Sequence, residues 1–180
     1  NTMRKWLCYA TDPANHLIYG WREIAQLAST SQIDPPDPDV TVTILQVDAS
    51  GLLMADGLTP VAGDHTTDAA PPNENDYSTA LLITYGEIDY LTAGDTDGEY
   101  YTEFLGDLPL YSYNAGETLL VPRLSRTVEL LRVNHHGSSH SSNPTYIDTL
   151  NPSDAFISCG GNPYGHPAQE SLDRLTATSN

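Results

Sequence analysis

Side chains that bind metal ions follow three predicted strands of this sequence, each at the point where the strand ends. They are Asp95, the adjacent pair His135 and His136, and His166. Imidazole and carboxylate groups together suit zinc, manganese or iron, and zinc lowers the pKa of a bound water to about 7. A carboxylate such as Asp95 can also bridge two ions, and two ions about 3.5–4 Å apart can hold both the attacking and the leaving oxygen of a phosphoester.

Each of these residues also has an ordinary structural explanation. Asp95 precedes a threonine and, taken alone, is more often a turn residue. Adjacent residues of a strand point to opposite faces, so we expect one of His135 and His136 to face an ion and the other to pack or support it. His166 precedes a proline, as at the start of a helix. Two further histidines, at positions 16 and 65, lie in poorly patterned stretches and receive no role.

The elements that position these residues follow from hydrophobic periodicity and turn residues. Strands are predicted at 40–47, 78–85, 88–93, 128–133 and 155–158. Helices are predicted at 100–108, 145–150 and 168–175, with a further helical stretch within 1–30. The proline-rich segment 34–39 must be a loop, and 55–76, which has no periodicity, is expected to be a long surface loop. Strands mixed with short helices predict an α/β or α+β fold, here as a single domain over 1–180.

The amino-acid composition limits which functions and cellular locations this protein can have. The 24 acidic and 7 basic residues give a net charge of -17, which repels phosphate backbones and argues against a general nucleic-acid-binding module. A bound divalent ion reverses the sign of the local electrostatic field inside its own site, so the repulsion does not apply there. A chain with one lysine and many acidic residues suggests an extracytoplasmic location or adaptation to salt. No apolar stretch is long enough to span a membrane. Cys8 and Cys159 could pair in an oxidising compartment, and their redox state stays open.

Four short motifs occur in an order that resembles the C-terminal half of the metallo-β-lactamase superfamily, most closely the domain attached to bacterial competence (DNA-uptake) channels and its soluble relatives. The motifs cover about 100 residues: Asn75-Asp76-Tyr77-Ser78, Gly94-Asp95 after a hairpin, Asn134-His135-His136-Gly137-Ser138, and Asn162-Pro163-Tyr164-Gly165-His166-Pro167. The resemblance implies an αββα sandwich, of which this chain would be only the C-terminal part.

By that resemblance, Asp95 bridges two divalent ions, zinc or manganese, and His135 or His136 is a metal ligand. His166 lines the site as a ligand or a transition-state contact. The resemblance also implies that Ser138, like His166, is a catalytic residue. Three further residues border the substrate: Asn75, Ser78 and Gly137. The implied reaction is attack of metal-bound hydroxide on a phosphodiester, of DNA or of a small molecule.

The chain departs from the family in one respect. It lacks the family's His-x-His-x-Asp-His motif, or its variant His-x-Asp-x-Asp-His, before the Gly-Asp motif. We therefore expect an upstream segment or parent chain to carry that motif and complete the domain. Two alternatives remain: the same fold acting on a small ester, thioester or lactone, because one fold hosts many chemistries, or a truncated, non-catalytic interaction module.

Overall fold

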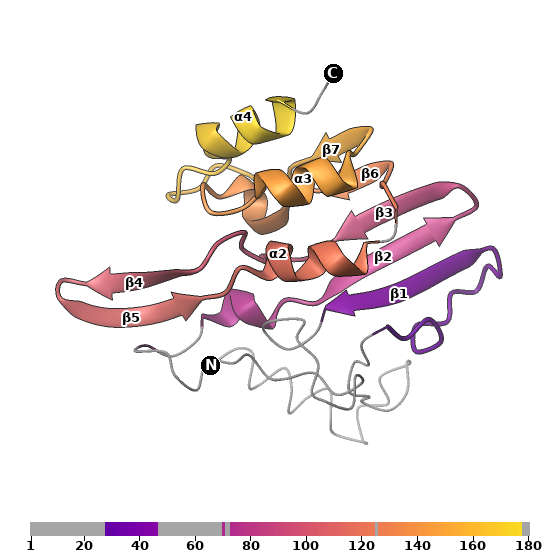
Figure 1. Cartoon of the computed structure of the whole chain (residues 1–180), viewed down its shortest axis with the longest axis horizontal. Coiled ribbons are helices and arrows are strands. Elements are labelled where there is room, and N and C mark those ends of the chain that lie inside the picture. The colour runs from indigo at the N-terminus through magenta and orange to yellow at the C-terminus, as the bar shows by residue number, and fades with distance from the viewer. Residues whose placement is uncertain (1–27, 47–69, 71–72, 125, 178–180) are drawn as a thin grey trace.

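The computed structural model describes residues 28–46, 70, 73–124 and 126–177. The predicted helical stretch within 1–30 lies almost wholly outside these residues, as do Cys8, His16, His65 and most of the predicted loop 55–76. The described part has an α+β architecture, with a five-stranded mixed sheet, a separate two-stranded sheet and three short α-helices (Figure 1). None of the helices in these ranges is long and apolar enough to cross a membrane.

The larger sheet has the strand order β1-β2-β3-β6-β7. Its strands are β1 (Val40–Gln46), β2 (Ala80–Tyr85), β3 (Ile88–Thr92), β6 (Leu130–Arg132) and β7 (Asp154–Phe156). Every strand predicted from alternating apolar residues is present, with ends that differ by up to two residues. The turn between β2 and β3 is formed by Gly86 and Glu87, and Gly86 has the positive φ (61°) that favours glycine in a two-residue hairpin.

The direction of the strands divides the sheet into two parts. β1, β2 and β3 are antiparallel, whereas β3, β6 and β7 are mutually parallel. The carboxyl ends of these three parallel strands therefore meet at one edge of the sheet. Asp95 follows β3, His135 follows β6 and His166 follows β7, so the pairing direction brings the three predicted positions to the same edge.

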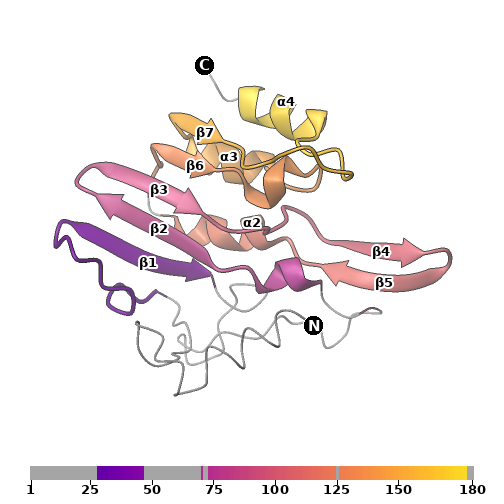
Figure 2. The ribbon, with the colours of Figure 1, turned by 180° about the vertical axis from the view of Figure 1, so that it is seen from behind.

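Two short helices cover one face of the sheet, and Figure 2 shows the opposite face. They are α2 (Gly116–Leu120) and α3 (Pro144–Leu150), with α4 (Gln169–Ala177) packed on α3. Asn143 caps α3 through its side chain and Pro144 occupies the first turn, a favoured combination. The buried core between helices and sheet is apolar and includes Leu45, Leu91, Leu120, Leu131, Tyr146, Ile147 and Leu150.

The prediction of a helix at 100–108 was wrong. The segment forms a hairpin, β4 (Tyr101–Leu105) and β5 (Leu108–Tyr113), that projects from the body of the molecule (Figures 1 and 2). Gly106 has φ 63° and makes a two-residue turn with Asp107, and Pro109 cannot continue a helix. A second correction concerns the end of the predicted loop 55–76, because Glu74–Tyr77 forms a 3-10 turn, η2, capped by the Asn73 side chain.

Candidate functional site

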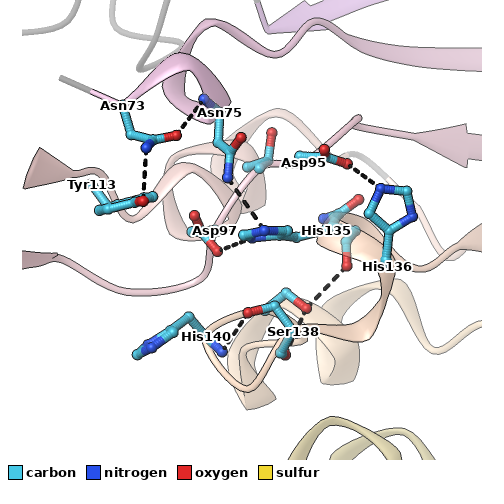
Figure 3. A network of polar contacts seen from close by, with 12 residues as sticks. Asn73, Asn75, Asp95, Asp97, Tyr113, His135, His136, Ser138 and His140 are labelled. Atoms are coloured by element: carbon cyan, nitrogen blue, oxygen red, sulfur yellow. Dashed lines mark hydrogen bonds and ion pairs between the residues drawn. The ribbon is translucent and has the colours of Figure 1, made fainter. Parts of the chain in front are cut away.

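A pocket of about 700 Å³ lies at the edge where the three parallel strands end. Among the residues predicted to form a site, those that line it are Asn75, Asp95, His135, His136, Ser138 and His166. Figure 3 shows the side chains of Asp95, His135 and His136 close together, and they come from two segments, the loop after β3 and the turn after β6. Segments that are far apart in the sequence therefore supply the groups around one cavity.

The paired histidines lie in a turn and not at the end of a strand. β6 ends at Arg132, and His135 (φ 46°) and His136 (φ 53°) are both left-handed within the turn η4 (Asn134–Gly137). Because the extended alternation has already ended, both rings line the pocket, and the expectation that only one of them would face a common metal ion stays a prediction. Left-handed backbone costs about 1–2 kcal/mol per residue, and hydrogen bonds from His135 N to Gly94 O (3.1 Å) and from Ser138 N to His135 O (2.9 Å) help to hold the turn.

His135 is oriented by a buried carboxylate. Its Nδ1 lies 2.7 Å from Asp97 Oδ1, and its Nε2 lies 3.3 Å from the Asn75 amide nitrogen. An amide nitrogen only donates, so the bond from Asn75 leaves the ring proton on Nδ1, where it is donated to Asp97. Burial alone lowers the pKa of His135, but the hydrogen bond and the charge of Asp97 outweigh it and raise the pKa overall.

His136 faces Asp95 with a nitrogen that the neutral ring leaves unprotonated. Its Nδ1 is bonded to the carbonyl oxygen of Ser158, which only accepts, so Nδ1 carries a proton. The opposite nitrogen, Nε2, lies 3.4 Å from Asp95 Oδ1. In the neutral ring this places a nitrogen lone pair against a carboxylate oxygen, an arrangement that favours a cation at this point. The guanidinium of Arg132 already lies 3.9 Å from the same Asp95 oxygen.

His166 lines the pocket from the loop after β7. The side chain of Asn162 holds that loop through four hydrogen bonds to its backbone. Asn162 Oδ1 accepts hydrogen bonds from Tyr164 N and His166 N, both at 3.1 Å, and its Nδ2 donates to Gly160 O and His166 O. The His166 ring meets His135 edge-on, with centroids 5.3 Å apart. Burial and the neighbouring histidines lower the pKa of His166, so its ring is held neutral. Its Nδ1 is buried and has no partner among the described residues.

Two of the residues predicted to border a substrate do not line the pocket, because they support its walls. Ser78 Oγ accepts from Asp95 N at 3.0 Å, and Gly94 (φ 60°) has room only for a hydrogen, since a Cβ there would lie 2.9 Å from Ser78 Oγ. A Cβ on Gly137 would lie 2.9 Å from Pro167 Cβ, so the two histidine-bearing loops pack closely there. Ser138 is nearly buried, and its hydroxyl accepts from His140 N.

The sequence analysis missed two acidic groups near the pocket. Asp97 follows Asp95 by two residues, and residues at this spacing on an extended chain point to the same side. The spacing could therefore have predicted that Asp97 lies near the same site as Asp95. Glu117, fully buried on α2, accepts hydrogen bonds from Asn134 Nδ2 (2.9 Å), Ser142 N (2.9 Å) and Asn143 N (2.6 Å). It therefore holds the first residue of the histidine turn and the end of the loop that follows the turn. Nothing in the local sequence distinguishes Glu117 from a solvated glutamate.

The same analysis missed an aromatic wall, because the segment that carries it was predicted to be a helix. Tyr101 stacks between Tyr113 (centroids 4.1 Å apart) and His140 (4.0 Å), and all three residues line the pocket. Tyr113 also accepts a hydrogen bond from the Asn73 amide at 2.7 Å (Figure 3). The hairpin stem therefore forms one side of the cavity.

The pocket offers part of a metal-ligand set. Within the described ranges, no three His, Cys, Asp or Glu side chains are grouped so that they could hold one ion. The donor types nevertheless suit zinc or manganese, since Asp95 faces a histidine nitrogen and His166 Nδ1 is buried without a partner. An orphaned buried nitrogen is costly unless something outside the described residues meets it.

Comparison with known proteins gives one partial similarity. No protein-family model matches the chain. The chain is 29% identical over 106 residues, 58% of its length, to ComE operon protein 3 of Bacillus subtilis (strain 168). The matched part spans 12% of the length of that protein.

Proposed function

We propose that this chain is part of a metallo-β-lactamase-like, metal-dependent hydrolase that cleaves phosphodiester bonds in DNA in a DNA-uptake context. The observation that carries the proposal is the His136 nitrogen that faces the Asp95 carboxylate at 3.4 Å, in a pocket where three parallel strands end. The similarity to ComE operon protein 3 supports the context. The order of the motifs around Asp95, His135 and His166 supports the family.

Electrostatics of the pocket favour a cation-dependent reaction. No Lys or Arg is among the described residues that line it, whereas Asp95 and Glu103 are, and Arg132, which is not a lining residue, approaches Asp95 Oδ1 only to 3.9 Å. An anionic phosphodiester would meet negative charge there unless a divalent ion reversed the field. Asp95, His136 and His166 are the residues that would hold such ions, with further ligands from the segment expected to complete the domain. When bound, the ions would supply a hydroxide nucleophile and charge neutralisation.

The chain's own residues have distinct parts in this proposal. Asp97 fixes the proton of His135 on Nδ1 and leaves Nε2, beside the Asn75 amide, as the site that accepts a proton in the pocket. As the alternative to holding an ion, His166, whose lowered pKa favours the neutral ring, can act as an uncharged donor or acceptor toward the substrate. Glu117 and Ser78 hold the backbone that carries these groups.

The experiment compares Asp95→Asn with Asp107→Asn. Both aspartates follow a glycine of positive φ, but Asp107 is exposed in the hairpin turn and lies outside the pocket. The parent protein, or this chain joined to its completing segment, should hydrolyse bis-p-nitrophenyl phosphate and DNA with Mn²⁺ or Zn²⁺ and lose both activity and metal content only with Asp95→Asn.

Two outcomes would contradict the proposal. Turnover of a lactone or thioester without phosphodiesterase activity would favour the small-ester alternative. Equal metal content and no turnover in the parent and Asp95→Asn proteins would leave the non-catalytic interaction module.

A further inference from the structure

We propose that the end of the β4–β5 hairpin binds the surface of a neutral, zwitterionic phospholipid bilayer. Three apolar side chains form this apolar tip: Phe104, Leu105 and Leu108, which flank the Gly106-Asp107 turn. The apolar tip shares no residue with the lining of the pocket, so its role is independent of the proposed hydrolase.

The first observation is how far the apolar tip is exposed. Phe104 is 59% exposed, Leu105 69% and Leu108 70%. Leu105 and Leu108 lie directly opposite each other in the strand register, so their side chains stand on the same face of the hairpin. The hairpin projects from the body of the molecule (Figures 1 and 2). Its end can therefore reach a flat surface while the main sheet and the helices stay away from that surface.

Polarity along the hairpin changes in the order in which a bilayer changes with depth. Tyr111, 39% exposed, lies three residues from Leu108, about 10 Å along a strand that rises about 3.3 Å per residue. A hairpin tilted by about 45°, as membrane strands are, reduces this separation in depth to about 7 Å, close to the thickness of the headgroup layer. With Leu108 at the edge of the hydrocarbon, Tyr111 therefore lies among the headgroups, the layer that tyrosine prefers.

The backbone and one carboxylate limit how deeply the hairpin can enter. Within the described ranges, β4 and β5 pair only with each other, so the N–H and C=O groups on their outer edges need water or headgroups. Pro109 has no N–H, which removes one such donor beside the apolar tip. The charge of Asp107 in the turn opposes entry into hydrocarbon. Insertion therefore stops at the boundary between headgroups and acyl chains.

Charge selects the kind of lipid. Residues 99–113 contain three acidic side chains, Glu99, Glu103 and Asp107, and no Lys or Arg, in a chain whose net charge is -17. An anionic membrane surface attracts basic segments and repels acidic ones. Phosphatidylcholine has no net charge, and its ammonium groups complement the carboxylates around the apolar tip. The occupant that fits is thus a neutral bilayer.

The size of the apolar tip argues against a second copy of this chain in the same place. A stable protein–protein interface takes about 20–30 residues from each side, whereas this surface offers three apolar side chains. Two copies would also bring Glu103 and Asp107 of each chain together, and the net charge of -17 on each opposes association. A bilayer needs no minimum area, because each apolar side chain that enters it adds to the affinity.

The test is sedimentation of the full chain with sucrose-loaded phosphatidylcholine vesicles at millimolar lipid. We expect weak, reversible binding, below the association constant of about 10⁴ M⁻¹ that one myristoyl chain provides. The double variant Leu105→Ser, Leu108→Ser should reduce binding about tenfold or more, because two leucines no longer leave water. Asp107→Asn should strengthen binding several-fold, a gain that loss of fold cannot produce. Phosphatidylglycerol in the vesicles should weaken binding, and added salt should restore it by screening the repulsion.

The matched control is the double variant Tyr85→Ser, Ile88→Ser. These residues, 53% and 50% exposed, flank the Gly86-Glu87 turn as the two leucines flank theirs, but their hairpin belongs to the main sheet. This control should bind vesicles as the parent chain does. An equal loss in both double variants, no binding to phosphatidylcholine, or tighter binding to phosphatidylglycerol at low salt would overturn the proposal.

Sedimentation velocity without vesicles tests the second copy directly. The chain should show no self-association that depends on Leu105 and Leu108. Self-association that the Leu105→Ser, Leu108→Ser variant abolishes would assign the apolar tip to a second copy and would overturn the bilayer proposal.

Discussion

Asp97 Oδ1 lies 2.7 Å from His135 Nδ1, and the aspartate is buried while the histidine ring reaches the pocket. A second carboxylate–histidine pair, Glu99 with His140, has the same 2.7 Å separation between Oε1 and Nδ1. The two pairs differ in exposure, since the Glu99 and His140 side chains are 57% and 40% exposed. Because of this difference in burial, we expect the Asp97–His135 pair to contribute more to the free energy of unfolding than the Glu99–His140 pair does.

The first prediction compares these pairs. Asp97→Ala should lower the free energy of unfolding by about 1–3 kcal/mol, because it leaves the half-buried Nδ1 of His135 without its acceptor. Glu99→Ala should change the free energy by about 0.5 kcal/mol or less, because exposed ion pairs contribute little. Urea unfolding of both variants measures the difference. Equal losses would show that burial does not distinguish the pairs.

The second prediction concerns Gly94. An alanine in left-handed backbone costs about 1–2 kcal/mol, which should apply equally to Gly94→Ala and Gly106→Ala, with φ 60° and 63°. Only Gly94 also has a neighbour in the way, Ser78 Oγ at 2.9 Å from the added Cβ. Gly94→Ala should therefore destabilise more in urea unfolding, and Ser78→Gly should relieve the excess in the double variant. A Gly106→Ala loss as large as that of Gly94→Ala would contradict this contact.

The third prediction concerns pH. Burial raises the pKa of Glu117 to about 7, against the hydrogen bonds from Asn143, Ser142 and Asn134 that lower it. Between the unfolded value of 4.5 and the folded value of about 7, the native protein binds the extra proton. The stability this contributes is full below the unfolded pKa and is lost as pH rises through the folded pKa, a change of roughly 3 kcal/mol.

Glu117→Gln should remove that slope. The free energy of unfolding of the parent chain, measured by urea at a series of pH values, should fall between pH 4.5 and 7 more steeply than that of Glu117→Gln, whatever the constant offset between them. Glu170→Gln, an exposed glutamate in the first turn of α4, serves as the control and should keep the parent slope. Parallel curves for the parent and Glu117→Gln would show that Glu117 does not titrate in this range.

The fourth prediction concerns the loop after β7. Asn162→Ala removes the acceptor for Tyr164 N and His166 N and the donor to Gly160 O and His166 O. Amide hydrogen exchange at Tyr164 and His166 should become faster, because local opening of the loop costs less free energy when these hydrogen bonds are absent. Exchange in the β2–β3 hairpin should stay unchanged. Unaltered protection at Tyr164 would mean that other contacts hold the loop.

The strands of the main sheet were predictable because their signal is local. Alternation in Val40–Gln46 and the Gly86-Glu87 turn specify extended chain and a hairpin from neighbouring residues alone. The β4–β5 hairpin was missed although Gly106-Asp107 carries the same kind of turn signal. The burial of Glu117 was beyond local reasoning, because its hydrogen-bond donors lie from 17 to 26 residues away.

The sequence by itself determined which residues could carry chemistry: Asp95, His135, His136 and His166 follow strands, and their types suit metal ions and proton transfer. Only the tertiary structure decided that β3, β6 and β7 run parallel, since that direction depends on how the connecting segments pack α2 and α3 on the sheet. Parallel pairing places three carboxyl ends at one edge, and there the left-handed turn at His135 and His136 directs both rings into one pocket.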